Sequence, residues 1–203
     1  MKHLVIYAHP DSKSFCHAIK EEFVEVLKAH GKEVVVRDLY AENFDPVLRN
    51  KELKGNLKNM DIAEDIKIEQ AYIKWADVIT FIYPIWWSHM PAILKGYIDR
   101  VFSVDFAFSV NEKGEVKGLL TDKRILLINT MGASKDLYLK KGILSSIELI
   151  VDECIFKSLE MEVVSHHFFG DMTNGTDEYR KNILKQIKHI ATGATNEINE
   201  IYF

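Results

Sequence analysis

Short apolar runs alternate with amphipathic stretches along most of this chain, and the alternation limits the possible folds more than any other feature. The runs of buried-strand length are His3–Tyr7, Glu33–Arg37, Asp77–Tyr83, Lys123–Asn129 and Met161–Phe168. Between them, apolar residues recur at helical spacing. Helices are therefore expected from Phe15 to about Leu27, closed by Gly31, and over Ala63–Trp75, Pro91–Phe102 and Thr176–Ala191.

Alternating strands and helices are typical of a parallel sheet with right-handed crossovers. Nearly continuous apolar strands fit a sheet that is buried on both faces. Five strand–helix units predict an α/β, flavodoxin-like fold with strand order 2-1-3-4-5 and helices on both faces. We expect a single domain over residues 1–203, with a polar excursion at 41–60 and a C-terminal tail at 193–203.

Composition excludes several other classes of protein. The 203 residues carry a formal net charge of −4, and the Lys and Arg side chains are dispersed, so no nucleic-acid partner is expected. Cys16 and Cys154 lack the spacing of a zinc site. His166 and His167 point to opposite faces of a strand and cannot share one metal ion. No signal peptide or membrane-spanning run is evident, which favours a cytoplasmic protein without membrane insertion.

Three segments that follow strands have unusual compositions. In an open α/β sheet, ligands bind at the carboxyl ends of the strands, where the strand order reverses. The first such segment, residues 9–16, leads into a helix with the hydroxyls of Ser12 and Ser14 and the amides of Phe15 and Cys16. A helix start of this kind binds phosphate, although an ordinary N-cap beside a buried His9 is an equal alternative. No glycine precedes Gly31, so the glycine-rich dinucleotide fingerprint is absent.

The other two segments are 84–91 and 129–134. Trp86 and Trp87 stand between a strand and a helix, where they either fill the core or form the walls of a pocket for a flat ring. In the last segment, Thr130 and Gly132 allow the backbone to approach a ligand closely.

Two stretches, YAHPDSKSF and EQAYIKWADVITFIYPIWWSHMPAILKGYIDRVF, resemble the NAD(P)H:quinone oxidoreductases of the flavodoxin-2 type. This group includes DT-diaphorase, drug-activity modulators and potassium-efflux ancillary reductases, and the resemblance extends from His3 to about Arg180. It implies a homodimer that binds a flavin, either FAD or FMN. NADH or NADPH would give hydride to flavin N5, and a quinone-like acceptor would then receive it in a ping-pong cycle.

The resemblance also implies which residues bind the flavin. By position they are His9, Ser14, Phe15, Cys16, Gln70, Pro84, Ile85, Trp86, Trp87, Asn129, Thr130, Met131, Gly132, Tyr138 and Arg180. Arg180 matches an arginine at the adenosine end of FAD in diaphorase-type members, so FAD is slightly favoured over FMN.

Catalytic and substrate roles follow from the same resemblance, with departures. Tyr138 aligns with the tyrosine of the family's proton relay after a one-residue shift, but the relay histidine is missing. His89 is a second candidate proton donor, or else a surface histidine. Trp87, Phe106 and Phe108 are expected at the acceptor site, where Phe108 replaces a tyrosine. The apolar stretch 106–108 is also expected to be exposed at the dimer interface.

Other functions remain open for this sequence. An azo- or nitroreductase would be a substrate variant of the same enzyme. A flavin-containing ancillary subunit of a membrane transporter is a second alternative. A flavodoxin-type electron carrier is disfavoured, because the chain is near neutral and lacks a glycine-containing phosphate loop.

Overall fold

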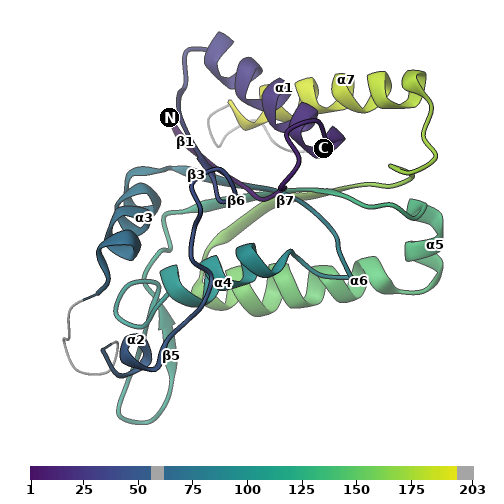
Figure 1. Ribbon diagram of the computed structural model, residues 1–203. Helices are drawn as coiled ribbons and strands as arrows, with labels where there is room; N and C mark the ends of the chain where they lie inside the picture. The colour runs from purple at the N-terminus through teal and green to yellow at the C-terminus, as the bar shows by residue number, and fades with distance from the viewer. Residues whose placement is uncertain (56–61, 196–203) are drawn as a thin grey trace.

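The computed structural model, which describes residues 1–55 and 62–195, has a five-stranded parallel sheet between two layers of helices (Figure 1). The sheet order is β2-β1-β3-β6-β7, and every neighbouring pair is parallel. The strands are β1 (Lys2–Tyr7), β2 (Glu33–Asp38), β3 (Val78–Pro84), β6 (Arg124–Thr130) and β7 (Glu162–Phe169). Because β4 and β5 form a separate hairpin, this order is the predicted 2-1-3-4-5, and the flavodoxin-like fold is confirmed.

Helices cover both faces of the sheet. On one face lie α1 (Phe15–Ala29) and α7 (Asp177–Ala194), which pack against each other. On the other face lie α3 (Glu64–Trp75), α4 (Ala92–Val101), α6 (Ile143–Glu148) and the π-helix η1 (Leu149–Phe156). Successive strand residues point to opposite faces, so Leu4 and Ile6 join the core under α4 while Val5 and Tyr7 join the core under α1.

Side-chain caps mark the starts of α1 and α7. The Ser14 hydroxyl accepts a hydrogen bond from the His17 amide, and the Thr176 hydroxyl accepts one from the Tyr179 amide. Pro91 is the N-cap of α4 and not its first helical residue. Helix α7 continues to Ala194, so the predicted tail begins later than residue 193, and residues 196–203 lie outside the described part of the chain.

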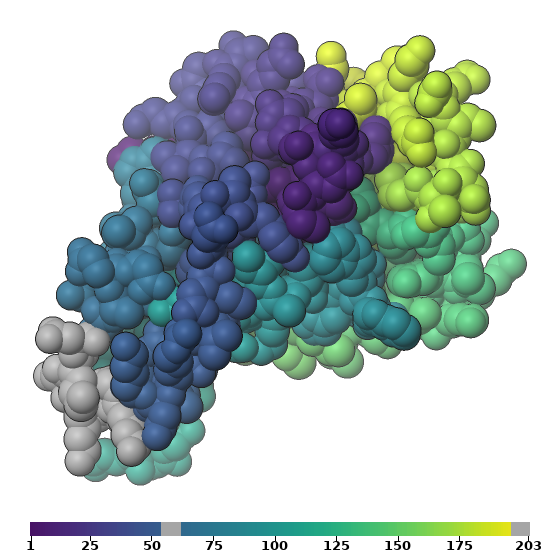
Figure 2. Space-filling view, viewed as in Figure 1, coloured from purple at the N-terminus to yellow at the C-terminus, as the bar shows by residue number. Residues whose placement is uncertain are grey.

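The predicted excursion contains a helix that the sequence pattern did not indicate, α2 (Asn50–Gly55). It is held by Arg100 of α4, whose guanidinium donates to Glu52, to Asp65 and to the backbone carbonyl of Asp45. Residues 41–55 therefore run along the surface as a packed segment, drawn in blue in Figure 2. The rest of the excursion, 56–60, lies outside the described residues.

Other short elements were also missed. They are the hairpin β4 (Phe108–Val110) and β5 (Val116–Gly118), the helix α5 (Lys135–Lys140), and the run of α6, η1 and η2 (Lys157–Leu159). Apolar residues of the π-helix do not follow a 3.6-residue period, because a π-helix has a wider turn.

The expectation of an exposed apolar stretch at 106–108 is wrong. Phe106 and Ala107 are buried in the core, and only Phe108 is partly exposed. The ammonium of Lys74 lies 5.5 Å from the centroid of the Phe106 ring. The segment turns inward because the amide of Ala107 bonds to the carbonyl of Ser103 and its carbonyl accepts the amide of Leu119.

Acid should unfold this protein through two histidines, His3, which is buried, and His167, which is partly buried. Burial lowers the pKa of His3 to about 4, and burial together with His166 lowers the pKa of His167 to about 4, from an ordinary value of 6.5. The unfolded chain therefore binds these protons first. Stability is present above pH 6.5 and is lost as the pH falls towards 4. His3 alone should account for a loss of about 2 kcal/mol between pH 7.5 and pH 4.5.

Urea unfolding across this pH range measures the effect. His3→Met, which cannot titrate, should lose less stability between pH 7.5 and 4.5 than the wild type. The exposed residue His30 provides the control, because His30→Gln should follow the wild type. Parallel losses in the wild type and His3→Met would contradict the assignment to His3.

Candidate active site at the carboxyl edge of the sheet

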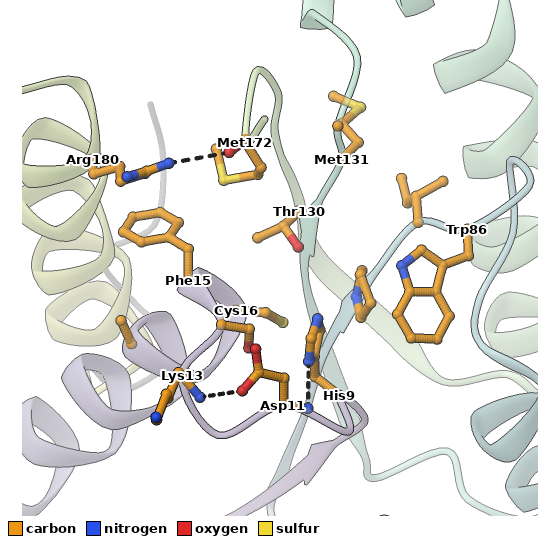
Figure 3. Close-up of a pocket in the computed structure, with 15 residues that line it drawn as sticks. His9, Asp11, Lys13, Phe15, Cys16, Trp86, Thr130, Met131, Met172 and Arg180 are labelled. Carbon is orange, nitrogen blue, oxygen red and sulfur yellow. Dashed lines mark hydrogen bonds between the residues drawn. The ribbon is translucent and has the colours of Figure 1, made fainter. Parts of the chain in front are cut away.

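A cavity of about 520 Å³ lies at the carboxyl ends of the strands (Figure 3). It is bounded by the turns that follow β1, β3, β6 and β7 and by the start of α7. Strand β1 lies between β2 and β3, so the chain order reverses there. The cavity is therefore where open α/β sheets bind their ligands.

The turn after β1 forms one wall and is stiffened by local hydrogen bonds. The amide of Lys13 donates to the Asp11 carboxylate over 2.8 Å, and the amide of Asp11 donates to Nδ1 of His9 over 3.0 Å. Phe15 and Cys16 are the first two residues of α1, so their amides have no acceptor within the helix. These amides and the positive end of the helix dipole make this wall an anion site.

His9 has a defined protonation state in this wall. Its Nδ1 accepts the hydrogen bond from Asp11, so the ring proton is on Nε2. Burial lowers the pKa of His9 and keeps the ring neutral near pH 7. Its ring contacts the indole of Trp86 edge to face, with 5.7 Å between centroids. His9 therefore offers a donor without a charge.

The turn after β3 forms the second wall. The amide of Trp86 donates to the carbonyl of His89 over 2.9 Å, and the amide of His89 donates back over 3.0 Å. The two residues between them, Trp87 and Ser88, have φ values of +52° and +60°. This left-handed pair closes a tight two-residue turn that glycine or asparagine would adopt more easily. The turn leaves Trp86 40% exposed and Trp87 fully exposed.

The turn after β6 forms the third wall. The amide of Ile85 donates to the carbonyl of Thr130 over 2.7 Å, which joins this wall to the previous one. At Gly132, an added Cβ would lie 3.1 Å from the hydroxyl of Thr173, so there is little room for a side chain. Burial raises the pKa of Cys16 to about 12, and a hydrogen bond with Thr130 opposes this shift. The Cys16 thiol is therefore protonated and is not a nucleophile.

Arg180 supplies positive charge from α7 (Figure 3). Its Nη2 donates to the carbonyl of Met172 over 3.3 Å, and its Nη1 lies 3.6 Å from the exposed Asp177 carboxylate. Its Nε is buried and has no partner among the described residues. A buried N–H without an acceptor is costly, so this position suits an anionic ligand.

Most of the residues predicted to bind a cofactor line this cavity. They are His9, Ser14, Phe15, Cys16, Pro84, Ile85, Trp86, Thr130, Met131, Gly132 and Arg180. The lining also includes Asp11, Lys13, Ala18 and Met172, which were not among the predicted cofactor residues. The rule that found the first three turns would have found Met172 as well, because it follows β7.

Two predicted cofactor residues have side chains committed elsewhere. Gln70 lies outside the lining, and its amide donates to the carbonyl of Val101 and to the hydroxyl of Ser103. Asn129 is fully buried, and its side chain contacts His166 and the carbonyl of Tyr83. These hydrogen bonds leave the two amides with structural roles.

The predicted catalytic and acceptor residues also lie outside the cavity lining. Tyr138 and Phe108 pack against the core on the α4 side, and Phe106 is buried in it. His89 is partly buried, and its Nδ1 accepts the amide of Met90 over 2.9 Å. Trp87 lies on the same turn as Trp86 but is directed into solvent.

Comparisons with known proteins identify the family of this chain. Residues 1–192 match the flavodoxin-2 family model, described as a flavodoxin-like fold. An uncharacterized NAD(P)H oxidoreductase of Haemophilus influenzae is 40% identical over 186 residues, which cover 91% of each chain. NAD(P)H dehydrogenase (quinone) 1 of Cavia porcellus is 36% identical over 73% of this chain, and the match spans 59% of that enzyme.

Solved structures with a similar fold include two flavodoxin-like enzymes. The NAD(P)H:quinone oxidoreductase of Methanothermobacter marburgensis has a TM-score of 0.88 and 28% identity, and covers 96% of this chain and 98% of its own. An FMN-dependent NADH-azoreductase of Bacillus anthracis, solved with FMN, has a TM-score of 0.73 and 20% identity over 96% of this chain and 99% of its own, which shows a shared fold.

Proposed function

The chain belongs to the flavodoxin-2 family and is an oxidoreductase, and from this premise we propose that it is a flavin-dependent NAD(P)H oxidoreductase with a quinone-like acceptor. The observation that carries this proposal is one cavity with a cationic, amide-lined end and an aromatic end. An anionic cofactor with a flat ring fits such a cavity.

The anion end fits the phosphate of a flavin. The amides of Phe15 and Cys16, the side chain of Lys13 and the guanidinium of Arg180 would hold it. The buried Nε of Arg180, which lacks a partner among the described residues, is a donor that such a phosphate would satisfy. These groups would be sufficient to hold FMN. The adenosine part of FAD would extend past Arg180, and the position of Arg180 therefore favours FAD.

The other end fits the flavin ring. Pro84, Ile85 and Trp86 come from one turn and Met131 from the next, so apolar surface would bound the ring on two sides. A flavin in this position supplies reversible hydride transfer, while the chain supplies position and hydrogen bonds. Donor and acceptor would use the same opening in turn, which makes the proposed kinetics ping-pong.

Neither His89 nor Tyr138 lines the cavity, so proton supply in the proposed reaction falls to solvent unless one of these side chains changes position. Because Nδ1 of His89 accepts a backbone amide, its proton is on Nε2. Burial, together with the charge of Lys95, lowers the pKa of His89, so the doubly protonated ring forms only in acid. The hydroxyl of Tyr138 lies outside the cavity lining, so Tyr138 would need a change of position to serve as the donor.

We also propose that the enzyme is a cytoplasmic homodimer. Large apolar side chains are exposed on α5 and η1, namely Leu137, Leu139, Leu149 and Ile150. Together with Trp87, they are candidates for coverage by a second copy. Among the residues of 1–55 and 62–195, no helix has the length and apolarity required to span a bilayer.

Flavin identity and turnover test the proposed function. Heat should release a flavin from the purified protein, and mass spectrometry should identify it as FMN or FAD. NADH or NADPH should then reduce menadione with parallel lines in double-reciprocal plots. A protein that binds neither flavin would contradict the proposal. Turnover of an azo dye without turnover of quinones would show that the acceptor is an azo compound and not a quinone.

Arg180→Gln should weaken flavin binding. It removes a charged donor whose hydrogen bond to a phosphate is worth about 1.5–3 kcal/mol, so the Kd of FMN should rise roughly 10- to 100-fold. Arg49→Gln is the matched control, since Arg49 is exposed and pairs with Asp45 outside the cavity. Fluorescence quenching of FMN measures both. An unchanged Kd in Arg180→Gln would remove Arg180 from the site.

Trp87→Ala tests the exposed indole. Its loss removes no core contact, so the free energy of unfolding should change by less than about 0.5 kcal/mol. Menadione turnover should nevertheless fall, or the dimer seen by light scattering should dissociate. The control is Trp75→Phe, which changes a partly buried tryptophan on α3. Wild-type turnover and an intact dimer in Trp87→Ala would exclude Trp87 from both roles.

A further inference from the structure

A chain of polar side chains crosses the otherwise apolar core beside the cavity. Nδ1 of His166 lies 2.8 Å from the Asp152 carboxylate, and Nε2 of His166 lies 2.5 Å from Oδ1 of Asn129. The Asn129 amide nitrogen donates to the carbonyl of Tyr83 over 3.4 Å. The His166 side chain is 3% exposed and that of Asp152 is 12% exposed. The proposed function assigns no role to the contacts among Asp152, His166 and Asn129.

Hydrogen bonding determines the protonation of His166. Both ring nitrogens face oxygen atoms, and a neutral imidazole has only one N–H to donate. Turning the Asn129 amide around would give Nε2 a donor, but it would also place Oδ1 against the carbonyl of Tyr83. With the Asn129 amide as it lies, Oδ1 towards Nε2, the acceptors are unopposed only when both ring nitrogens carry protons. His166 is then an imidazolium, paired with a buried carboxylate.

An aromatic ring supports the same state. Phe168 is two residues along β7, on the same face of the sheet, and its ring stacks on that of His166 with 4.0 Å between centroids. A cation over an aromatic face is attracted by the ring's quadrupole.

The carboxylate comes from an unusual element. Asp152 lies within the eight-residue π-helix η1. π-Helical turns are rare and occur frequently at functional sites. The ion pair between Asp152 and His166 is surrounded by an otherwise apolar core and attaches this π-helical turn to β7.

The polar chain ends on two walls of the cavity. Asn129 precedes Thr130, and Tyr83 precedes Pro84, and both of the following residues line the cavity. The amide of Ile85 also bonds to the carbonyl of Thr130. The position of the Asn129 amide thus bears on two wall segments that a ring-shaped ligand would contact.

We infer that His166 is a positioning residue, an imidazolium that Asp152 holds against Asn129 so that the ends of β3 and β6 form the cavity walls. Its relevance to flavin binding rests on the proposed function. A buried ion pair contributes little net stability compared with apolar side chains of the same size. The role inferred for the His166–Asp152 pair is to hold the cavity walls at the ends of β3 and β6 in a single geometry.

Nuclear magnetic resonance of the full chain tests the protonation state without any cofactor. In protein with ¹⁵N-labelled histidine at pH 7.5, both ring nitrogens of His166 should carry protons. In Asp152→Asn, only one should. A neutral His166 ring in the wild type would overturn the inference, and this measurement does not depend on a variant that folds.

Backbone amide shifts test the positioning role. Asp152→Asn should move the amide signals of Ile85 and Met131. Glu52→Gln is the matched control, because it breaks the Arg100–Glu52 pair, with side chains 4% and 12% exposed, on segments that do not line the cavity. It should leave those two signals unchanged. Unmoved signals in Asp152→Asn, or equal movement in both variants, would overturn the positioning role.

Flavin affinity separates this inference from the proposed function. Asp152→Asn should raise the Kd of FMN about tenfold, within the range of coupling through packed networks, whereas Glu52→Gln should not. A wild-type protein that binds no flavin defeats the proposed function, while the ring protons and the amide shifts still decide the role of His166. A wild-type Kd in Asp152→Asn overturns the positioning role.

Discussion

The parallel pairing of β1, β3 and β6 is the constraint on which the remaining structure depends. It aligns Tyr7 with Ile82 and Pro84 with Thr130, so three turns leave the sheet at one edge. Both faces of the sheet are covered by helices, which limits the access of a polar ligand to them. The edge is the place where backbone amides and charged side chains can face a cavity without losing hydration on every side. The anion-binding wall and the aromatic wall are therefore neighbours because of strand register, although the residues that form them are about 70 positions apart.

Much of this could be predicted from the sequence, because the relevant signals are local. Strand length, helical spacing and the Ser14 and Thr176 caps involve residues within a few positions of each other, and they located the strands and helix starts. The rule about carboxyl ends then located most of the cavity lining. Side-chain direction within a turn has no such local signal. Trp86 and Trp87 are adjacent in the sequence, yet one lines the cavity and the other is directed into solvent, because Trp87 has a positive φ.

Burial that depends on distant partners could not be predicted either. Phe106 was expected to be exposed, but its burial depends on Lys74 and on how the hairpin β4–β5 closes over the segment. Gln70 matches a family position, but its direction depends on Val101 and Ser103, about 30 residues away. The contact of Asp152 with His166 depends on a π-helix that has no recognisable sequence period. Each of these features arises from tertiary packing, which single-sequence patterns do not encode.

The turn at Trp87 shows how local strain points to an external contact. A non-glycine residue with positive φ costs on the order of 1–3 kcal/mol, and here two such residues follow each other. The mutual hydrogen bonds of Trp86 and His89 enforce this conformation, but they do not require an indole at the next position. A glycine there would relieve strain and expose no apolar surface. The indole of Trp87 contributes nothing to the core of its own chain, and under the proposed function it would contact a molecule outside the chain. A bound acceptor or a second copy at the mouth of the cavity meets that condition, and either one would explain why the strained turn adjoins the aromatic wall.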